Sequence, residues 1–208
     1  MHIPDGGFVP FWQCIVYYVI IIVIGYFAIR WVKNNLDERK IPLLAVFGAG
    51  IFAIQTINIP LPVGSDLHII GTALVAILLG SPYASFLVML IVIIIQSLIF
   101  GDGGVTTLGV NVLNMGVIGS FLGYYLFKRL KLIITVNQAV FIACFLSVFI
   151  AAIAHSFELF FAGTLTLQVA LLTIGLPYLL IGIVGEGTVS TIVYIAIKNL
   201  RPDLISED

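Results

Sequence analysis

Seven apolar segments, separated by short polar or glycine-rich stretches, follow one another along the 208-residue sequence. A helix that crosses a bilayer needs about 20 mostly apolar residues. The predicted spans are Pro10–Val32, Ile41–Pro60, His68–Leu79, Ala84–Phe100, Thr107–Phe127, Leu132–Phe161 and Leu167–Ile197. The third is short for a full span, so we expect it to be tilted, broken or helped by its flanks. Because backbone groups in hydrocarbon must be hydrogen-bonded internally, runs of this length predict helices rather than barrel strands.

The composition agrees with a chain whose main solvent is lipid. Hydrophobic residues make up 61% of the sequence and charged residues only 9%, which is too little polar surface for a water-soluble domain of this size. No interdomain linker or low-complexity tract interrupts the apolar pattern. The sequence therefore predicts one all-α, polytopic domain over residues 1–208, passing several times through the cell membrane.

The basic residues predict the orientation of the chain. All nine fall in three groups, which follow the first, fifth and seventh spans: Arg30, Lys33, Arg39 and Lys40; Lys128, Arg129 and Lys131; Lys198 and Arg201. Seven spans place these groups on the same side, which the positive-inside rule makes cytoplasmic. The N-terminus is then outside and the C-terminus inside, an agreement that one span more or fewer would break.

The opposite face carries acidic residues and histidines but no lysine or arginine. Its charged and imidazole groups are Asp5, Asp66, Asp102, Glu158, His2, His68 and His155. Such a face should concentrate cations. Acidic outer loops also follow from the orientation rule alone, but that alternative does not explain why all three histidines lie there.

The first two residues can form a chelate. Histidine is too large at position 2 for the usual removal of the initiator methionine, so Met1 should keep a free amine. That amine and the His2 backbone nitrogen close a five-membered ring on a metal ion, and the backbone nitrogen and the His2 imidazole close a six-membered ring. A fourth donor is then needed, and His68, in the outer loop before the third span, can supply it.

Such a set of four nitrogens suits Ni(II) and Cu(II), with Co(II) also possible, and suits Mg(II) or Ca(II) poorly. Its affinity should fall as the pH drops, because the nitrogens must lose protons to bind. A lone histidine near an N-terminus is by itself a weak indication of metal binding. The turn-forming residues Pro4 to Gly7 could fold the tail back into the helices. Asp5 would then cap that turn or accept a hydrogen bond from a ligand imidazole.

Other polar residues lie inside the predicted spans or at their ends. Asn111 and Asn114 share a helix face and could hold the N-terminal loop or simply join helices. His155 and Glu158 also share a face. They could support the ligands or form a polar cap on the outer surface. Glu186 is predicted near the middle of the bilayer, in the transport path or in a structural hydrogen bond.

Two segments carry a family resemblance. "MHIPDG" at the N-terminus, with "HIIGTALVAILLG" after a Gly/Pro-rich loop, resembles the substrate-binding (S) membrane component of energy-coupling-factor importers for cobalt and nickel, the CbiM/NikM family. The resemblance implies an N-terminal metal-binding loop (1–9), an extra helix (10–32) and a six-helix core (41–198). It implies the same ligands as the chelate argument, namely Met1, His2 and His68.

The resemblance also implies partners. These are a transmembrane coupling (T) subunit, two ATPase subunits and, in many cases, a small accessory membrane subunit. In similar components an Ala-x-x-x-Ala stripe docks the coupling subunit, a role that Ala45, Ala49 and Ala53 match; internal helix packing is the alternative. The ion would be a transported substrate, Co(II) or Ni(II), with cobalt favoured because similar components serve cobalamin synthesis.

The sequence does not favour an enzyme. It has neither a P-loop nor an HExxH motif, so any ATP hydrolysis belongs to partners. One rival is a self-contained secondary carrier or channel for a divalent cation, for which Glu186 and Glu158 are the available intramembrane charges. Another is an assembly subunit without a ligand.

Overall fold

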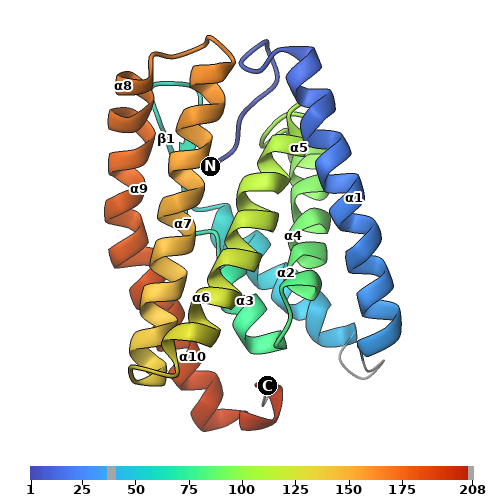
Figure 1. Cartoon of the computed structure of the whole chain (residues 1–208), viewed down its shortest axis with the longest axis vertical. Coiled ribbons are helices and arrows are strands. Elements are labelled where there is room, and N and C mark those ends of the chain that lie inside the picture. The colour runs from blue at the N-terminus through green and yellow to red at the C-terminus, as the bar shows by residue number, and fades with distance from the viewer. Residues whose placement is uncertain (37–40, 206–208) are drawn as a thin grey trace.

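In the computed structural model, which describes residues 1–36 and 41–205, the chain forms an elongated bundle of near-parallel helices (Figure 1). Arg39 and Lys40 lie outside the described residues. The helices are α1 (Phe11–Asn35), α2 (Ile41–Gln55), α3 (Thr72–Leu79), α4 (Pro82–Ile95), α5 (Leu108–Asn111), α6 (Gly123–Leu130), α7 (Val136–Phe161), α8 (Leu167–Ala170), α9 (Leu176–Ile181) and α10 (Thr188–Leu200). Several continue through π-helical segments, η2 (Gln96–Phe100), η3 (Val112–Leu122), η4 (Leu171–Gly175) and η5 (Gly182–Gly187), and a 3₁₀ turn, η6 (Pro202–Leu204), ends the described chain.

Within the described residues, five continuous helical rods are long and apolar enough to cross a membrane. They are Phe11–Asn35, Pro82–Phe100, Leu108–Leu130, Val136–Phe161 and Leu167–Leu200. The apolar α2 is shorter, and α3 has eight residues. The helical membrane protein expected from the sequence is confirmed, and five of the seven expected spans are full-length rods.

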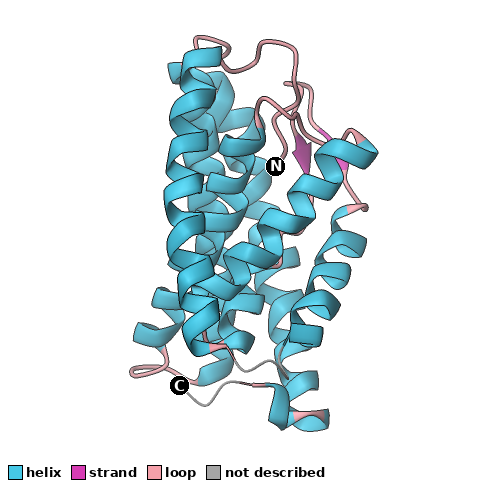
Figure 2. Ribbon diagram, turned by 90° about the vertical axis from the view of Figure 1, so that its right-hand side faces the viewer, coloured by secondary structure: helices cyan, strands magenta, loops and turns pink. Residues whose placement is uncertain are grey.

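The second and third expected helices were wrong at one end each. The helix expected over Ile41–Pro60 ends at Gln55, and β1 (Ile59–Pro60) pairs with β2 (Asp66–Leu67) as a short antiparallel ribbon (Figure 2). Pro60 lies in β1 and could not have continued the helix, because proline has no backbone N–H. The helix expected over His68–Leu79 starts only at Thr72, because Gly71 adopts a left-handed conformation with φ of 79°. His68 therefore lies in an extended, non-helical segment.

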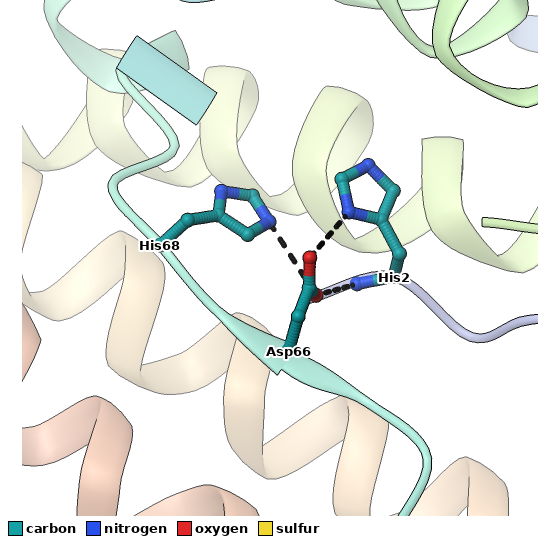
Figure 3. Close-up of side chains that lie close together, drawn as sticks. All are labelled: His2, Asp66 and His68. Carbon is teal, nitrogen blue, oxygen red and sulfur yellow. Dashed lines mark hydrogen bonds and ion pairs between the residues drawn. The ribbon is translucent and has the colours of Figure 1, made fainter. Parts of the chain in front are cut away.

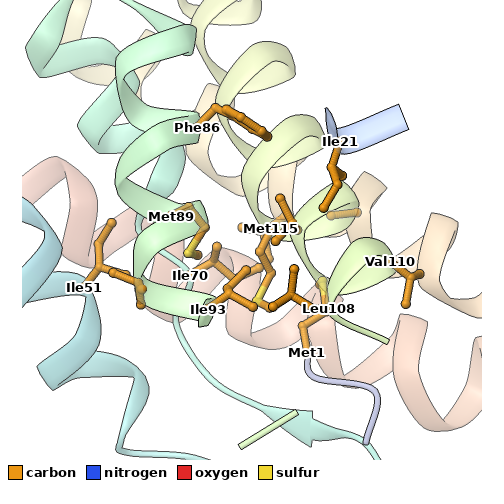
Figure 4. Packing of buried hydrophobic residues seen from close by; sticks show 14 of the residues in the cluster. Met1, Ile21, Ile51, Ile70, Phe86, Met89, Ile93, Leu108, Val110 and Met115 are labelled. Carbon is orange, nitrogen blue, oxygen red and sulfur yellow. The ribbon is translucent and has the colours of Figure 1, made fainter. Parts of the chain in front are cut away.

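The N-terminal segment enters the bundle instead of lying on its surface. Met1 and Ile3 are 0% and 1% exposed and belong to the main hydrophobic cluster. Figure 4 shows Met1 beside Leu108, Ile93 and Met115. Burying an apolar side chain of this size contributes roughly 1.5–3 kcal/mol. The core thus holds the amino terminus inside the bundle.

The described basic residues lie at one end of the bundle. The last turns of α1, α6 and α10 contain Lys33, Lys128 and Arg129, and Lys198. Arg30 lies one turn earlier in α1, and Lys131 and Arg201 directly follow α6 and α10; these three helix ends lie toward the bottom of Figure 1. The N-terminal segment and the β1–β2 ribbon lie toward the other end (Figure 1). This arrangement places the three basic groups on a common side, and the assignment of that side to the cytoplasm is a prediction of the charge rule.

Candidate metal centre

Hydrogen bonds between side chains and backbone groups hold the N-terminal segment against α5 and the loop that precedes it. Asn111 bonds both backbone groups of Ile3, accepting from its N–H (2.8 Å) and donating to its carbonyl (3.1 Å). The Asp5 carboxylate accepts from the N–H groups of Val105 and Thr106, both at 2.9 Å. Asp5 therefore supports the loop and does not contact an imidazole. Asn111 makes the contact with the N-terminal segment that the sequence suggested for one of the two asparagines.

The glycine-rich sequence of this loop allows the close approach. The Gly104 N–H donates to the Ile3 carbonyl at 3.1 Å. A Cβ at position 104 would lie 2.2 Å from a carboxylate oxygen of Asp5, so no larger residue fits without moving the N-terminal segment. Glycine at 104 thus positions the first residues of the chain.

The second part of the site comes from the short β2 strand and the extended residues after it. Side chains two residues apart in an extended chain point the same way, so Asp66 and His68 face the same space. Figure 3 shows both side chains directed toward His2. Asp66 is 8% exposed and His68 1% exposed, so the whole group lies inside the protein.

The predicted nitrogen ligands converge on the Asp66 carboxylate (Figure 3). Its Oδ1 accepts hydrogen bonds from the Met1 amine and from the His2 backbone N–H (2.6 Å), and lies 3.7 Å from His68 Nε2. Its Oδ2 lies 3.0 Å from His2 Nδ1. The Met1 amine also donates to the Asp66 carbonyl at 2.9 Å. One carboxylate thus contacts or faces all four nitrogens of the proposed set.

The charges in this space act on one another strongly because water is excluded. Burial lowers the pKa of the Met1 amine, and the Asp66 carboxylate opposes this shift without cancelling it. Burial alone would raise the pKa of Asp66, but the Met1 ammonium, the hydrogen bond from His2 and the two imidazoles together hold it well below its ordinary value. Asp66 therefore stays ionised, while the amine gives up its proton more readily than an exposed one.

His68 presents a free lone pair to the site. Its Nδ1 lies 2.9 Å from the Ile69 carbonyl, which can only accept, so Nδ1 carries the proton. Nε2 then holds the lone pair, and it is buried without a hydrogen-bond partner. Burial, followed by repulsion from the Met1 ammonium, lowers the pKa of His68 well below its ordinary value. The ring stacks on His2 with centroids 4.9 Å apart.

This arrangement can exchange protons for a metal ion. One ligand atom from each of His2, Asp66 and His68 lies within 4.8 Å of the others. Amine, imidazole and deprotonated amide nitrogens prefer late divalent transition metals, whereas Mg(II) and Ca(II) require mostly oxygen. The donor set thus fits Ni(II) or Co(II) better than a hard cation.

The remaining predicted residues have distinct surroundings. Asn114 donates to Glu158 Oε2 at 2.6 Å and, among the described residues, makes no hydrogen bond with the N-terminal segment. Glu158 is 7% exposed and His155 0%, so the expected alternative of an outer-surface polar cap is wrong. Both ring nitrogens of His155 are buried without a hydrogen bond, and the ring lies near the Met1 backbone.

Glu186 lies in η5, and its side chain contacts the backbone just before α3. Its Oε1 accepts from the backbone N–H groups of Ile70 and of Gly71, the latter at 2.9 Å, and its Oε2 has no hydrogen-bond partner. The predicted structural hydrogen bond is therefore present, and it fixes the backbone just after His68. Ala45, Ala49 and Ala53 are all exposed on α2, and the docking role of this stripe stays a prediction.

Sequence reasoning missed two contributors. It treated Asp66 only as part of the acidic outer face, although an Asp two residues before a histidine in an extended segment must share its direction. It did not consider Gln96, whose Oε1 lies 3.2 Å from His2 Nε2. A polar residue at the end of the otherwise apolar fourth span was the available signal.

The similarity to known proteins covers the whole bundle. The family model for CbiM, described as the cobalt uptake substrate-specific transmembrane region, matches residues 2–204. A proposed metal transport protein of Methanocaldococcus jannaschii is 36% identical over 99% of this chain and 95% of its own length. A proposed fused nickel transport protein of Archaeoglobus fulgidus is 38% identical over 100% of this chain and 68% of its own length.

The fold is shared as well. The crystal structure of a truncated transition metal transporter superposes with a TM-score of 0.90 at 29% identity, covering 96% of this chain and 99% of that one. The family match begins at residue 2 and therefore includes the N-terminal segment. A full-length family match, together with relatives above 30% identity, establishes the relationship: the chain belongs to the CbiM family of substrate-specific transmembrane proteins.

Proposed function

We propose that this chain captures Co(II) or Ni(II) through the Met1 amine, the His2 backbone nitrogen, His2 Nδ1 and His68 Nε2. The observation that carries the proposal is the convergence of these four nitrogens on one buried carboxylate. In the metal-free protein Asp66 neutralises the ammonium and holds the N-terminal residues in register. The incoming ion takes the place of the protons that now point at Asp66.

The relatives support the choice of ion. The family model is described by cobalt uptake, and a relative that covers the whole chain is named for nickel transport. The nitrogen set accommodates both ions, and we favour cobalt, destined for cobalamin synthesis. Titration of one purified preparation with each ion in turn compares the two affinities directly.

The decisive experiment measures binding to protein that begins at Met1 without a tag. We expect tight binding of Ni(II), with the diamagnetism of a planar four-nitrogen complex, and a loss of more than about 100-fold on His2→Leu, which removes the imidazole but keeps a large residue at position 2 and so retains Met1. A histidine outside the chelate, His155, provides the matched replacement, His155→Leu, which should keep the planar complex. Tight binding that survives His2→Leu would refute the site.

We further propose that uptake is driven by partners, namely a transmembrane coupling subunit, two ATPase subunits and a small accessory membrane subunit. An exposed apolar groove of about 640 Å³ between α2 and α4 supports a docking role. Ala45 and Ala49 are among the residues that line it. Small side chains allow a partner helix to approach closely. The groove thus suits a hydrophobic helix of the coupling subunit.

Enlarging one alanine tests the docking surface. Ala49→Leu should reduce co-purification of the coupling subunit while metal binding stays unchanged, because Ala49 is exposed on α2 and is none of the proposed ligands. Ala196→Leu, at an exposed alanine on α10, is the matched control. Equal recovery of the subunit with both variants would contradict this interface. Metal uptake by liposomes that hold this chain alone, without ATP, would instead support a self-contained carrier.

A further inference from the structure

A chain of buried amide side chains leads away from the His2 imidazole. His2 Nε2 lies 3.2 Å from Gln96 Oε1, at the first residue of η2. Gln96 Nε2 donates to Gln55 Oε1 at 2.9 Å, and Gln55 Nε2 donates to the Ile70 carbonyl at 3.0 Å. Gln55 is 0% exposed and Gln96 2% exposed, so water does not compete for these groups.

The carbonyl at the far end fixes the direction of every hydrogen bond in this chain. An amide side chain can turn over and exchange its donor for its acceptor, but a backbone carbonyl can only accept. Gln55 must therefore point its NH₂ group at Ile70, which leaves its oxygen facing Gln96. Gln96 must in turn donate to that oxygen, so its own oxygen faces His2 Nε2. Only a protonated Nε2 satisfies this contact.

The position of that proton decides which nitrogen can bind an ion. The six-membered chelate ring contains the metal, the His2 backbone nitrogen, Cα, Cβ, Cγ and Nδ1. Nε2 cannot close this ring because it is not bonded to Cγ. A neutral imidazole binds through the nitrogen that lacks a proton. A ring with its proton on Nε2 therefore offers Nδ1 to the ion, and the other tautomer cannot chelate.

We propose that Gln55 and Gln96 form a tautomer-fixing relay that holds the proton of His2 on Nε2 and so makes Nδ1 a ligand. This proposal rests on the proposed function and adds two positioning residues to it. The relay also joins the two halves of the site, because Ile70 follows His68 by two residues. It therefore sets the orientation of the His2 ring relative to the segment that carries the other imidazole.

The carboxylates beside Nδ1 favour an ion at that nitrogen. On that side the ring faces the acceptors Asp66 Oδ2 at 3.0 Å and Asp102 Oδ1 at 3.4 Å. A proton or a cation on Nδ1 satisfies these acceptors, so it is the relay at Nε2, and not the carboxylates, that fixes the tautomer. An ion at Nδ1 is surrounded by carboxylates, whereas an ion at Nε2 would displace Gln96 and leave the relay unpaired. A buried polar group without a partner is costly, so the relay opposes the second arrangement.

The experiment combines affinity with the position of the ring proton. Histidine labelled with ¹⁵N in the ring is incorporated into untagged protein, which is loaded with Ni(II) to give a diamagnetic complex suitable for NMR. We compare the wild type with Gln96→Met, which removes the acceptor at similar size, and with Gln55→Met, which frees the Gln96 amide to turn over. Gln168→Met, at an exposed glutamine, is the matched control.

We expect the wild type to carry the His2 proton on Nε2 in a hydrogen bond. Partners that orient a ligand imidazole typically change metal affinity by about 10–100-fold. Gln96→Met should lose affinity in that range and shift the His2 ring N–H signal, while the His68 signal stays in place. Gln55→Met should lose less, and the control should stay within about twofold.

Two results would overturn the relay. One is a wild-type spectrum with the His2 proton on Nδ1, and the other is a Gln96→Met protein that keeps both its affinity and its His2 signal. If Gln96→Met only destabilises the protein, its unfolding temperature falls while the His2 ring proton stays on the same nitrogen. That result would also contradict the relay. If Gln96→Met does not fold, Gln55→Met carries the same comparison. A wild type that binds no ion would refute the proposed metal site itself.

Discussion

Adding two glycines ahead of Met1 removes the terminal amine from the proposed site. A single glycine would create the N-terminal sequence Gly-Met-His, in which an amine, two backbone nitrogens and an imidazole chelate Ni(II) by themselves, so two are needed. The extension converts the terminal ammonium into a peptide N–H and keeps every side chain. The amine is completely enclosed, and it donates to the Asp66 carboxylate and to the Asp66 carbonyl. The extra residues therefore remove the first chelate ring and have no open space to occupy.

The expected loss of affinity follows from the role of the amine. Groups that only orient a ligand typically contribute 10–100-fold to metal affinity, so the loss of a ligand should exceed about 100-fold, or about 2.8 kcal/mol. The metal-free protein should also be destabilised. Removing one partner of a buried ion pair costs about 3–5 kcal/mol, because the other charge is left uncompensated.

The assay uses one fusion protein with two protease sites, which release a chain starting either at Met1 or at Gly-Gly-Met1. Calorimetry with Ni(II) and Co(II) gives the affinities, and thermal unfolding gives the stabilities. Adding Asp66→Asn to the extended chain should restore most of the stability, because no buried charge is then unpaired, but it should not restore binding. A glycine added after the last residue is the control.

Each part of this reasoning can be refuted separately. Equal metal affinities for the two chains would show that the amine is not a ligand. Equal unfolding temperatures would show that the ion pair with Asp66 contributes nothing to the fold. A destabilisation that persists after Asp66→Asn would mean that its cause is a steric clash between the N-terminal extension and the bundle, and not an unpaired charge.

Three further predictions concern the same site. His68→Ala should lower affinity by more than about 100-fold and His155→Ala by less than about 10-fold, measured by calorimetry; the reverse order would move the fourth ligand. Affinity should rise with pH, by at least about tenfold per unit below neutrality, because at least one proton leaves per ion and burial lowers the pKa of the Met1 amine. A pH-independent affinity would exclude a deprotonated amide ligand. Gly104→Ala should weaken binding at least about tenfold by displacing the N-terminal segment, whereas Gly50→Ala, with open space around it, should not.

The helical rods could be predicted from the sequence because hydropathy over about 20 residues depends little on detail. The long rods α1, α4–η2 and α7 lie close to the expected ranges. The ends of the shorter helices could not be predicted in this way. His68 to Gly71 are as apolar as the helix that follows. The left-handed Gly71 and the hydrogen bond that its N–H donates to Glu186 keep this segment extended.

The nitrogen ligands could be proposed from the sequence because chelation is local to the first two residues. Their surroundings could not, since these come from distant parts of the chain. Asp66 contacts Met1 across 65 positions and Gln96 contacts His2 across 94. Such contacts depend on how α2, η2 and β2 meet in space, which a single sequence does not specify.

Charge balance accounts for the presence of Asp66 at the centre of a nitrogen site. In the metal-free protein the Asp66 carboxylate and the Met1 ammonium sum to zero. Loading a divalent ion onto the proposed ligands expels one proton from that ammonium and one from the His2 amide, so two positive charges enter and two leave. The net charge of these groups is therefore zero before and after binding, whereas without the Asp66 carboxylate the same groups would carry a net positive charge in both states. Since a buried, unbalanced charge costs several kcal/mol, Asp66 makes the exchange of protons for metal feasible inside the bundle.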